Sequence, residues 1–201
     1  GSEVTPYSIL TRDDLQTKVS FGNDQTFPKV AFLDPRYTES LSWEITVNTA
    51  IDALSHNIEG YLSKMSTPAS DVLAQEGMTR FGLCIKNLMN KTITYEDREN
   101  LLYTSMMGGM VISHTGTTLA HSASYNLTYF KGVPHGKAIG YILKEYLRFN
   151  YDFVKEKINN VLRLMQLESI DEFHDVIKAL LGPAPALTED EIKKYAELAM
   201  K

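Results

Sequence analysis

The chain has 201 residues, with 20 Lys and Arg side chains against 25 Asp and Glu, which gives a formal net charge of -5. This length allows one large domain with an appendage, and a hydrophobic content of 43% is too high for a disordered chain. The acidic balance argues against a nucleic-acid binder, because phosphate contacts need a basic surface. Cys84 is the single cysteine, which excludes an intrachain disulfide and a cysteine-rich zinc site.

The first residues, Gly-Ser-Glu-Val-Thr-Pro, have neither the basic segment nor the apolar run of a signal peptide. Residues 101–130 contain no Asp, Glu, Lys or Arg, but frequent Ser and Thr, together with His114 and His121, interrupt the apolar run that a membrane span needs. We therefore expect this stretch to be the buried centre of a soluble, cytoplasmic domain with no membrane segment.

Residues 1–38 differ in pattern from the rest of the chain. Short β-leaning segments, separated by turn signals such as Gly22-Asn23-Asp24 and Asp34-Pro35, cover residues 4–10, 18–21 and 29–33. Two or three strands or extended segments are predicted here. They are too few to form a domain alone, so we expect them to pair with another part of the structure.

From residue 39 onward the apolar residues recur at helical spacing. Ser42 is the predicted cap of the first helix, and the proline at position 134 suits the first turn of a later one. The predicted helices cover residues 42–64, 69–89, 95–130 with a break at 108–109 or at 116, 134–149, and two short segments after capping boxes at 169–172 and 188–191. The predicted fold is mainly α with a short β stub at the N-terminus.

One carboxylate and three histidines form the most informative constellation. Asp52 and His56 are four residues apart on a predicted helix and therefore share a face. His121 and His135 flank a helix end, the Lys131-Gly132-Val133 turn and a helix start, an arrangement that can bring the two rings together. Such a mixed oxygen and nitrogen set suits Fe(II) or Zn(II). The alternative is that these histidines are hydrogen-bonded core residues.

Several motifs resemble, in order along the chain, the iron-containing (group III) alcohol dehydrogenases. Residues 51–61 (IDALSHNIEGY) resemble the D-A-L-x-H-x-I-E-x-Y helix of that family. Leu119-Ala120-His121 and Gly132-Val133-Pro134-His135-Gly136 resemble its second and third metal motifs. Residues 1–5 (GSEVT) and 31–35 (AFLDP) are similar to its G-T-G-S-E-V-T and I-L-D-P segments. The resemblance covers residues 1 to about 150.

The resemblance implies a domain organisation. Residues 39–201 would be an all-helical metal-binding domain, like the C-terminal half of dehydroquinate-synthase-like enzymes and truncated at its C-terminal end. Residues 1–38 would be the remnant or hinge of a cofactor-binding α/β domain, whose G-G-G-S phosphate loop the sequence does not contain. We therefore expect the metal domain of a larger enzyme, inactive alone, with the missing cofactor domain as its partner.

The resemblance also implies an activity, the NAD(P)-linked interconversion of a small-molecule alcohol and an aldehyde or ketone. Fe(II) or Zn(II) would be held by the four side chains identified above, Asp52, His56, His121 and His135. NAD or NADP would be bound mainly by the absent domain. Ser2, Thr5 and Lys18 match positions where the family touches the cofactor, although each also suits an ordinary turn or surface position.

Two further residues near these motifs invite a functional interpretation. Tyr125 stands where many family members carry another histidine; it is a candidate catalytic residue, and a position in the wall of the substrate pocket is the alternative that we favour. Glu59 follows Asp52 by seven residues. A place behind the metal ligands is one interpretation of Glu59, and we favour an exposed or helix-capping position.

Other interpretations of the whole chain stay open. One is a zinc-dependent enzyme similar to glycerol dehydrogenase or dehydroquinate synthase, and another is a helical metal-binding module without catalysis. Loss of a partner domain would expose apolar surface and favour a homo-oligomer.

Overall fold

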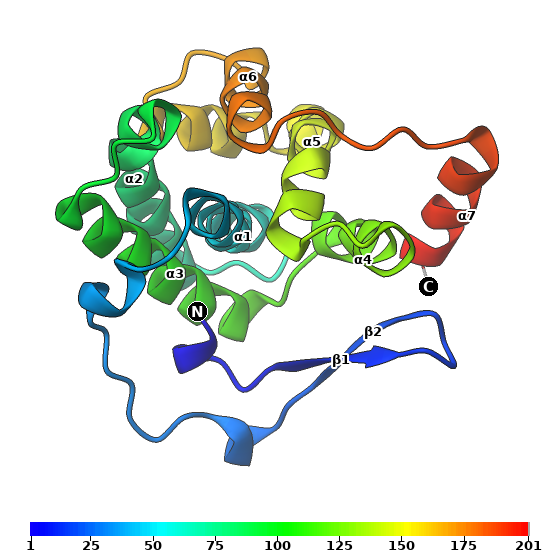
Figure 1. The fold of residues 1–201 in the computed structure, drawn as a ribbon, viewed down its shortest axis with the longest axis horizontal. Helices are drawn as coiled ribbons and strands as arrows, with labels where there is room; N and C mark the ends of the chain where they lie inside the picture. The colour runs from blue at the N-terminus through cyan, green and yellow to red at the C-terminus, as the bar shows by residue number, and fades with distance from the viewer. Residues whose placement is uncertain (201) are drawn as a thin grey trace.

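The structure is a computed structural model that describes residues 1–200. These residues form one antiparallel hairpin and seven α-helices (Figure 1). The strands are β1 (Ser8–Arg12) and β2 (Thr17–Phe21), and the helices are α1 (Trp43–Leu62), α2 (Pro68–Asn90), α3 (Tyr95–Thr115), α4 (Leu119–Lys131), α5 (His135–Leu164), α6 (Ile170–Leu181) and α7 (Glu189–Ala199). The mainly helical fold with a short β segment at the N-terminus is confirmed.

Helix α1 is the central element of the helical body. It packs against α2, α3 and α5, which surround it in Figure 1. Ile51, Leu54 and Ile58, spaced three and four residues apart, are 0% exposed. Full burial of each such side chain stabilises the fold by roughly 1.5–3 kcal/mol. This buried stripe fixes the rotation of α1 about its axis and thereby the direction of its polar residues.

The uncharged stretch of residues 101–130 is divided at Gly116. Helix α3 ends at Thr115, and Gly116 adopts φ +67°, which favours glycine. The glycine pair at 108–109 lies inside α3 instead. A Cβ on Gly108 would lie 2.9 Å from the Ala53 carbonyl oxygen, so this glycine allows α3 to approach α1 closely. Of the two breaks that the sequence allows, the second is the one that forms.

Of the two or three strands or extended segments predicted in residues 1–38, two form strands, and the first, β1, begins at Ser8 and not at Val4. Residues 29–33 form no strand, and the sheet consists of β1 and β2 alone within residues 1–200. Val30 and Phe32 are 68% and 90% exposed, so no packing stabilises an extended pairing there. Helix α5 runs to Leu164 and not to 149, because the chain resumes helical geometry after a non-helical Val154 and buries Ile158.

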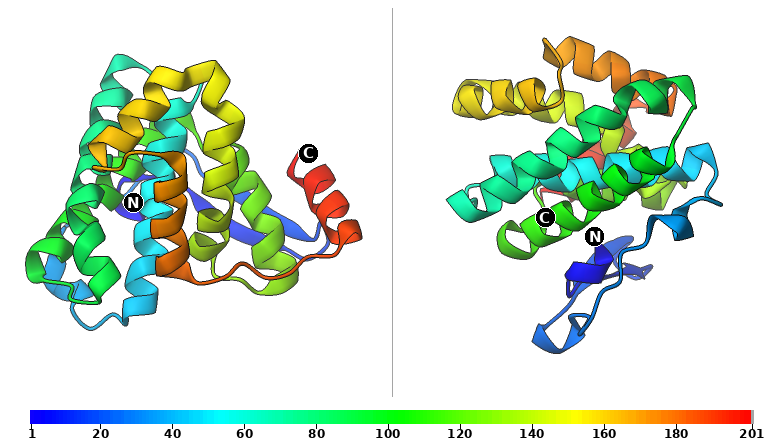
Figure 2. Two further views of the ribbon diagram at one scale, coloured as in Figure 1. Left: turned by 90° about the horizontal axis from the view of Figure 1, so that it is seen from above. Right: turned by 90° about the vertical axis from the view of Figure 1, so that its left-hand side faces the viewer.

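The hairpin projects from one side of the helical body (Figure 2). Ser8 pairs with Phe21 at its open end, and all five residues of β1 are exposed. Ile9 and Phe21 expose about half of their surface, 45% and 55%. None of the helices described by residues 1–200 combines the length and apolarity that a membrane span requires.

A glycine sets the start of α5 directly against α1. A Cβ on Gly136 would lie 1.8 Å from the carbonyl oxygen of Asn48, a position that no larger residue can occupy without a shift of the backbone. Pro134 is the N-cap of α5, so His135 is its first helical residue. This close crossing places His135 beside the polar face of α1.

We expect Gly136→Ala to lower the free energy of unfolding by about 1–3 kcal/mol, because the added methyl group overlaps the α1 backbone. Urea denaturation measures the change. Glu156→Ala, at an exposed position of the same helix, is the control and should change the free energy by less than about 0.5 kcal/mol. Equal stability of the two variants would contradict the close crossing.

Candidate metal centre

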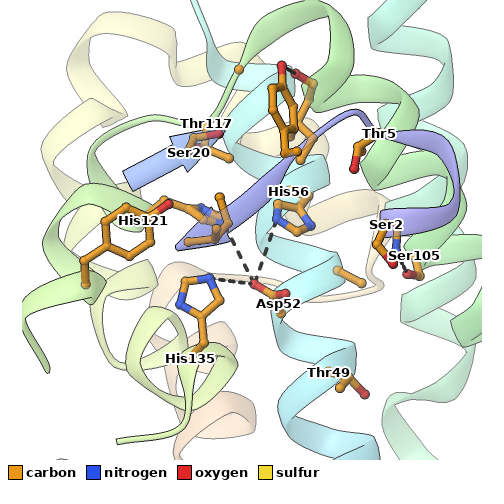
Figure 3. A pocket seen from close by; sticks show the side chains of 17 residues that line it. Ser2, Thr5, Ser20, Thr49, Asp52, His56, Ser105, Thr117, His121 and His135 are labelled. Atoms are coloured by element: carbon orange, nitrogen blue, oxygen red, sulfur yellow. Dashed lines mark hydrogen bonds and ion pairs between the residues drawn. The ribbon is translucent and has the colours of Figure 1, made fainter. Parts of the chain in front are cut away.

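A cavity of about 510 Å³ lies between the hairpin and helices α1, α3, α4 and α5. Its polar lining includes Ser20 from β2, Asp52 and His56 from α1, His121 from α4 and His135 from α5 (Figure 3). The structure thus brings together the carboxylate and three imidazoles that the sequence spacing singles out. They come from three helices, and their side chains point toward one another.

All three imidazoles direct Nε2 at one carboxylate oxygen. Asp52 Oδ1 lies 3.9 Å from His56 Nε2, 3.7 Å from His121 Nε2 and 3.6 Å from His135 Nε2 (Figure 3). These separations exceed hydrogen-bond distances. Asp52 Oδ1 and His121 Nε2 are both buried and have no hydrogen-bond partner among residues 1–200. Buried polar atoms normally have one, so the arrangement requires an explanation.

A divalent cation fits this set of donors. Ligand atoms that lie about 2.0–2.2 Å from a tetrahedral ion are separated from one another by roughly 3.4 Å. The separations between Asp52 Oδ1 and the three ring nitrogens, 3.6–3.9 Å, are close to this value. The ligand atoms of Asp52, His56 and His121 also lie within 4.8 Å of one another.

The environment keeps two of the rings uncharged. Burial, followed by repulsion from His121, lowers the pKa of His56 well below its ordinary value. Burial also lowers the pKa of His135 to about 4, against an opposing effect of Asp52. Neutral imidazoles have a free lone pair, which metal binding requires.

Glu59 lies behind His121. It is 0% exposed, so the exposed position that we favour from the sequence is wrong. Its carboxylate contacts His121 Nδ1 and accepts a hydrogen bond from the Thr118 backbone amide at 2.9 Å. Glu59 of α1 therefore caps the start of α4. Burial disfavours both charges, but their mutual attraction raises the pKa of His121 and lowers that of Glu59. The spacing from Asp52, two helical turns, is the signal that points to this shared face.

Tyr125 lines the same cavity. Its ring stacks on that of His135, with centroids 5.7 Å apart and planes at 26°. Burial raises the pKa of the phenol above its ordinary value of 10.0. At neutral pH Tyr125 is therefore a hydrogen-bond donor and a poor proton acceptor.

The three candidate cofactor residues have different positions. Ser2 and Thr5 line the cavity, whereas Lys18, on β2, is not among its lining residues within positions 1–200. Electrostatic repulsion from the Lys18 ammonium group nevertheless contributes to lowering the pKa of His135. Ser105 and Thr49 also line the cavity. No local sequence pattern marks these two hydroxyl groups.

Residues 46–200 match the family described as "Fe-containing alcohol dehydrogenase family, C-terminal". The chain belongs to this family. The match begins in α1 and ends after α7, so it includes the four side chains that converge in the cavity.

Individual relatives agree with this assignment. The chain is 29% identical over 180 residues to the probable alcohol dehydrogenase EutG of Salmonella typhimurium, covering 90% of this chain and 45% of that protein. It is similar to the crystal structure of an iron-containing alcohol dehydrogenase from Thermotoga maritima, with a TM-score of 0.88, 40% identity and coverage of 99% and 53%. It is also similar to the crystal structure of sulfoacetaldehyde reductase from Bifidobacterium kashiwanohense in complex with NAD+. The TM-score is 0.85 and the identity 30%, and the match covers 99% of this chain and 55% of that protein. The chain spans about half the length of these relatives.

We expect His56→Leu to leave the metal-free chain as stable as the wild type or more stable by up to about 1 kcal/mol. The partly buried ring has no hydrogen-bond partner within residues 1–200 to lose, and binding sites often reduce stability. Denaturation in the presence of a chelator measures this free energy. A loss above about 2 kcal/mol would show that His56 is a structural core residue.

Proposed function

We propose that this chain is the metal-binding part of an NAD(P)-linked alcohol dehydrogenase. Asp52, His56, His121 and His135 hold a divalent cation. The observation that carries this proposal is the convergence of three Nε2 atoms on one unpaired carboxylate oxygen. Family membership supports it, because the matched family is iron-containing.

When bound, such a cation supplies Lewis acidity that polarises the oxygen of an alcohol or carbonyl compound. Asp52 contributes the one formal negative charge among the four ligands, and the imidazoles are neutral donors. The set therefore leaves positive charge on a divalent ion. Both Fe(II) and Zn(II) accept this combination of donors, so a zinc-dependent enzyme of the glycerol-dehydrogenase or dehydroquinate-synthase type is the alternative within the same chemistry.

The cavity suits a small polar substrate. It has a volume of about 510 Å³ and is lined by the hydroxyl groups of Thr49 and Ser105 as well as by apolar side chains. Tyr125 forms part of the wall beside His135 and can donate a hydrogen bond to a substrate oxygen. We infer a small alcohol or the corresponding aldehyde or ketone as the substrate.

The cofactor would be NAD or NADP, held mainly by a separate α/β domain, with residues 1–38 as a hinge and residues 39–201 as the metal domain. Ser2 and Thr5, which line the cavity, and the cation of Lys18 would contact it from this chain. The NAD+ complex of sulfoacetaldehyde reductase supports the use of a nicotinamide cofactor. The exposed apolar side chains of the hairpin support contact with further protein.

We expect His121→Ala and His135→Ala each to weaken the binding of Fe(II) or Zn(II) by more than about 100-fold. Loss of a residue that only hydrogen-bonds to a metal ligand costs roughly 10–100-fold, and loss of the ligand itself should cost more. Competition against a chromophoric chelator measures the affinity. His114→Ala is the matched control, because His114 is exposed and its Nδ1 lies 2.7 Å from the Met110 carbonyl oxygen. Wild-type affinity in both ligand variants would contradict the assignment.

We expect the 201-residue chain alone to show negligible alcohol oxidation with NAD or NADP. It carries the metal ligands but no G-G-G-S phosphate loop. In this state it acts as a helical metal-binding module. The assay follows the absorbance of the reduced nicotinamide with a panel of short alcohols. Robust turnover by the purified chain would contradict the proposal that a separate domain binds most of the cofactor.

A further inference from the structure

Glu59 contacts the side of His121 that faces away from Asp52. The ring of His121 directs Nε2 toward Asp52 Oδ1, at 3.7 Å, and Nδ1 toward Glu59 Oε2. His121 is 3% exposed and Glu59 is 0% exposed, so neither group exchanges its partner for bulk water. The two carboxylates therefore lie on opposite sides of one buried imidazole.

We propose that Glu59 is a positioning residue that accepts the Nδ1–H of His121 and thereby presents the Nε2 lone pair to the metal. This role rests on the proposed function. It assigns a part in metal binding to a residue that does not reach the cavity lining. In general, a hydrogen bond to the second ring nitrogen of a metal-bound histidine fixes its tautomer and its orientation.

The hydrogen bonds of Glu59 indicate that the proton between Glu59 Oε2 and His121 Nδ1 belongs to the histidine ring. Its Oε1 atom faces the Thr118 amide at 2.9 Å, the Thr118 hydroxyl at 2.6 Å and the His121 amide at 3.4 Å. Backbone amides only donate, so this oxygen is an acceptor and holds no proton. The remaining oxygen, Oε2, faces the ring nitrogen. An N–H on Nδ1 satisfies both atoms.

The same carboxylate anchors the helix that carries the ligand. Thr118, the N-cap of α4, makes no capping bond with its own side chain, and Glu59 supplies the acceptor from α1. A negative charge at a helix N-terminus is favourable because it opposes the helix dipole. The Thr118 hydroxyl also lies 3.0 Å from the Tyr146 hydroxyl of α5. Glu59 thus links α1 to α4, and the Thr118 hydroxyl extends this network to α5.

The ring of His135 differs from that of His121 in this respect. His135 Nδ1 is buried without a hydrogen-bond partner in the part of the chain that the structure describes. A carboxylate on Nδ1 therefore distinguishes His121 from His135. The effect of removing Glu59 should consequently be specific to His121.

Glu59→Gln tests the role with a side chain of the same shape. The amide oxygen of Gln must face the Thr118 amide, because two donors cannot face each other there. Its NH₂ group then points at His121 Nδ1 and donates to it. This arrangement moves the ring proton to Nε2 and removes the lone pair that the metal needs. We expect a loss of Zn(II) affinity of roughly 10–100-fold.

Long-range ¹H–¹⁵N NMR reports the ring proton directly. Because any imidazole that binds Zn(II) through Nε2 has its proton on Nδ1, the metal-free chain with a neutral His121 ring is the informative sample. There we expect the proton on Nδ1 in the wild type and on Nε2 in Glu59→Gln. A proton on Nε2 of His121 in the metal-free wild-type chain would overturn the proposal, even if the variant does not fold.

Two control variants separate positioning from folding. Thr118→Val removes one hydrogen bond to Glu59 but keeps the carboxylate and the Thr118 amide, so it should lower the melting temperature and leave the tautomer of His121 unchanged. Glu99→Gln, at an exposed position of α3, should change none of these. Failure of the wild-type chain to bind Zn(II) would overturn the proposed function together with this role. Undiminished affinity in Glu59→Gln, with normal wild-type binding, would overturn this role alone.

Discussion

A buried carboxylate oxygen surrounded by three imidazole nitrogens, none within hydrogen-bonding distance, is the feature on which the rest of the site depends. Asp52 Oδ1 has no hydrogen-bond partner in the described part of the chain, and the three ring nitrogens lie 3.6–3.9 Å away. An unpaired buried polar atom costs free energy. A divalent cation between these atoms would remove that cost, because it would accept the lone pairs of all of them at once.

The fold holds these four side chains at this separation through packing and hydrogen bonds between the helices. The buried stripe of α1 fixes the direction of Asp52 and His56. Gly136 lets α5 start against α1 and brings His135 to the same oxygen. Glu59 ties the first turn of α4 to α1 and so places His121. Each helix that carries one of these side chains is therefore positioned relative to α1, and the hairpin lines one side of the cavity.

Much of this site is visible in the sequence, since Asp52 and His56 are four residues apart on one helix. The approach of His121 and His135 is harder to predict, because it depends on the break at Gly116 and on packing between distant helices. Glu59 shows the same limit: its spacing indicates the shared face, but only the tertiary structure brings the start of α4 onto it. Residues 29–33 fail as a strand because β propensity without a partner strand forms no sheet.

The metal content of the chain, purified anaerobically without chelators, tests the central claim most directly. Elemental analysis should find about one Fe or Zn per chain, as expected for one site with four protein ligands. That ion should be removed by a strong chelator and restored by Fe(II) or Zn(II). A correctly folded chain that contains no metal, and takes up none from excess Fe(II) or Zn(II), would contradict the account.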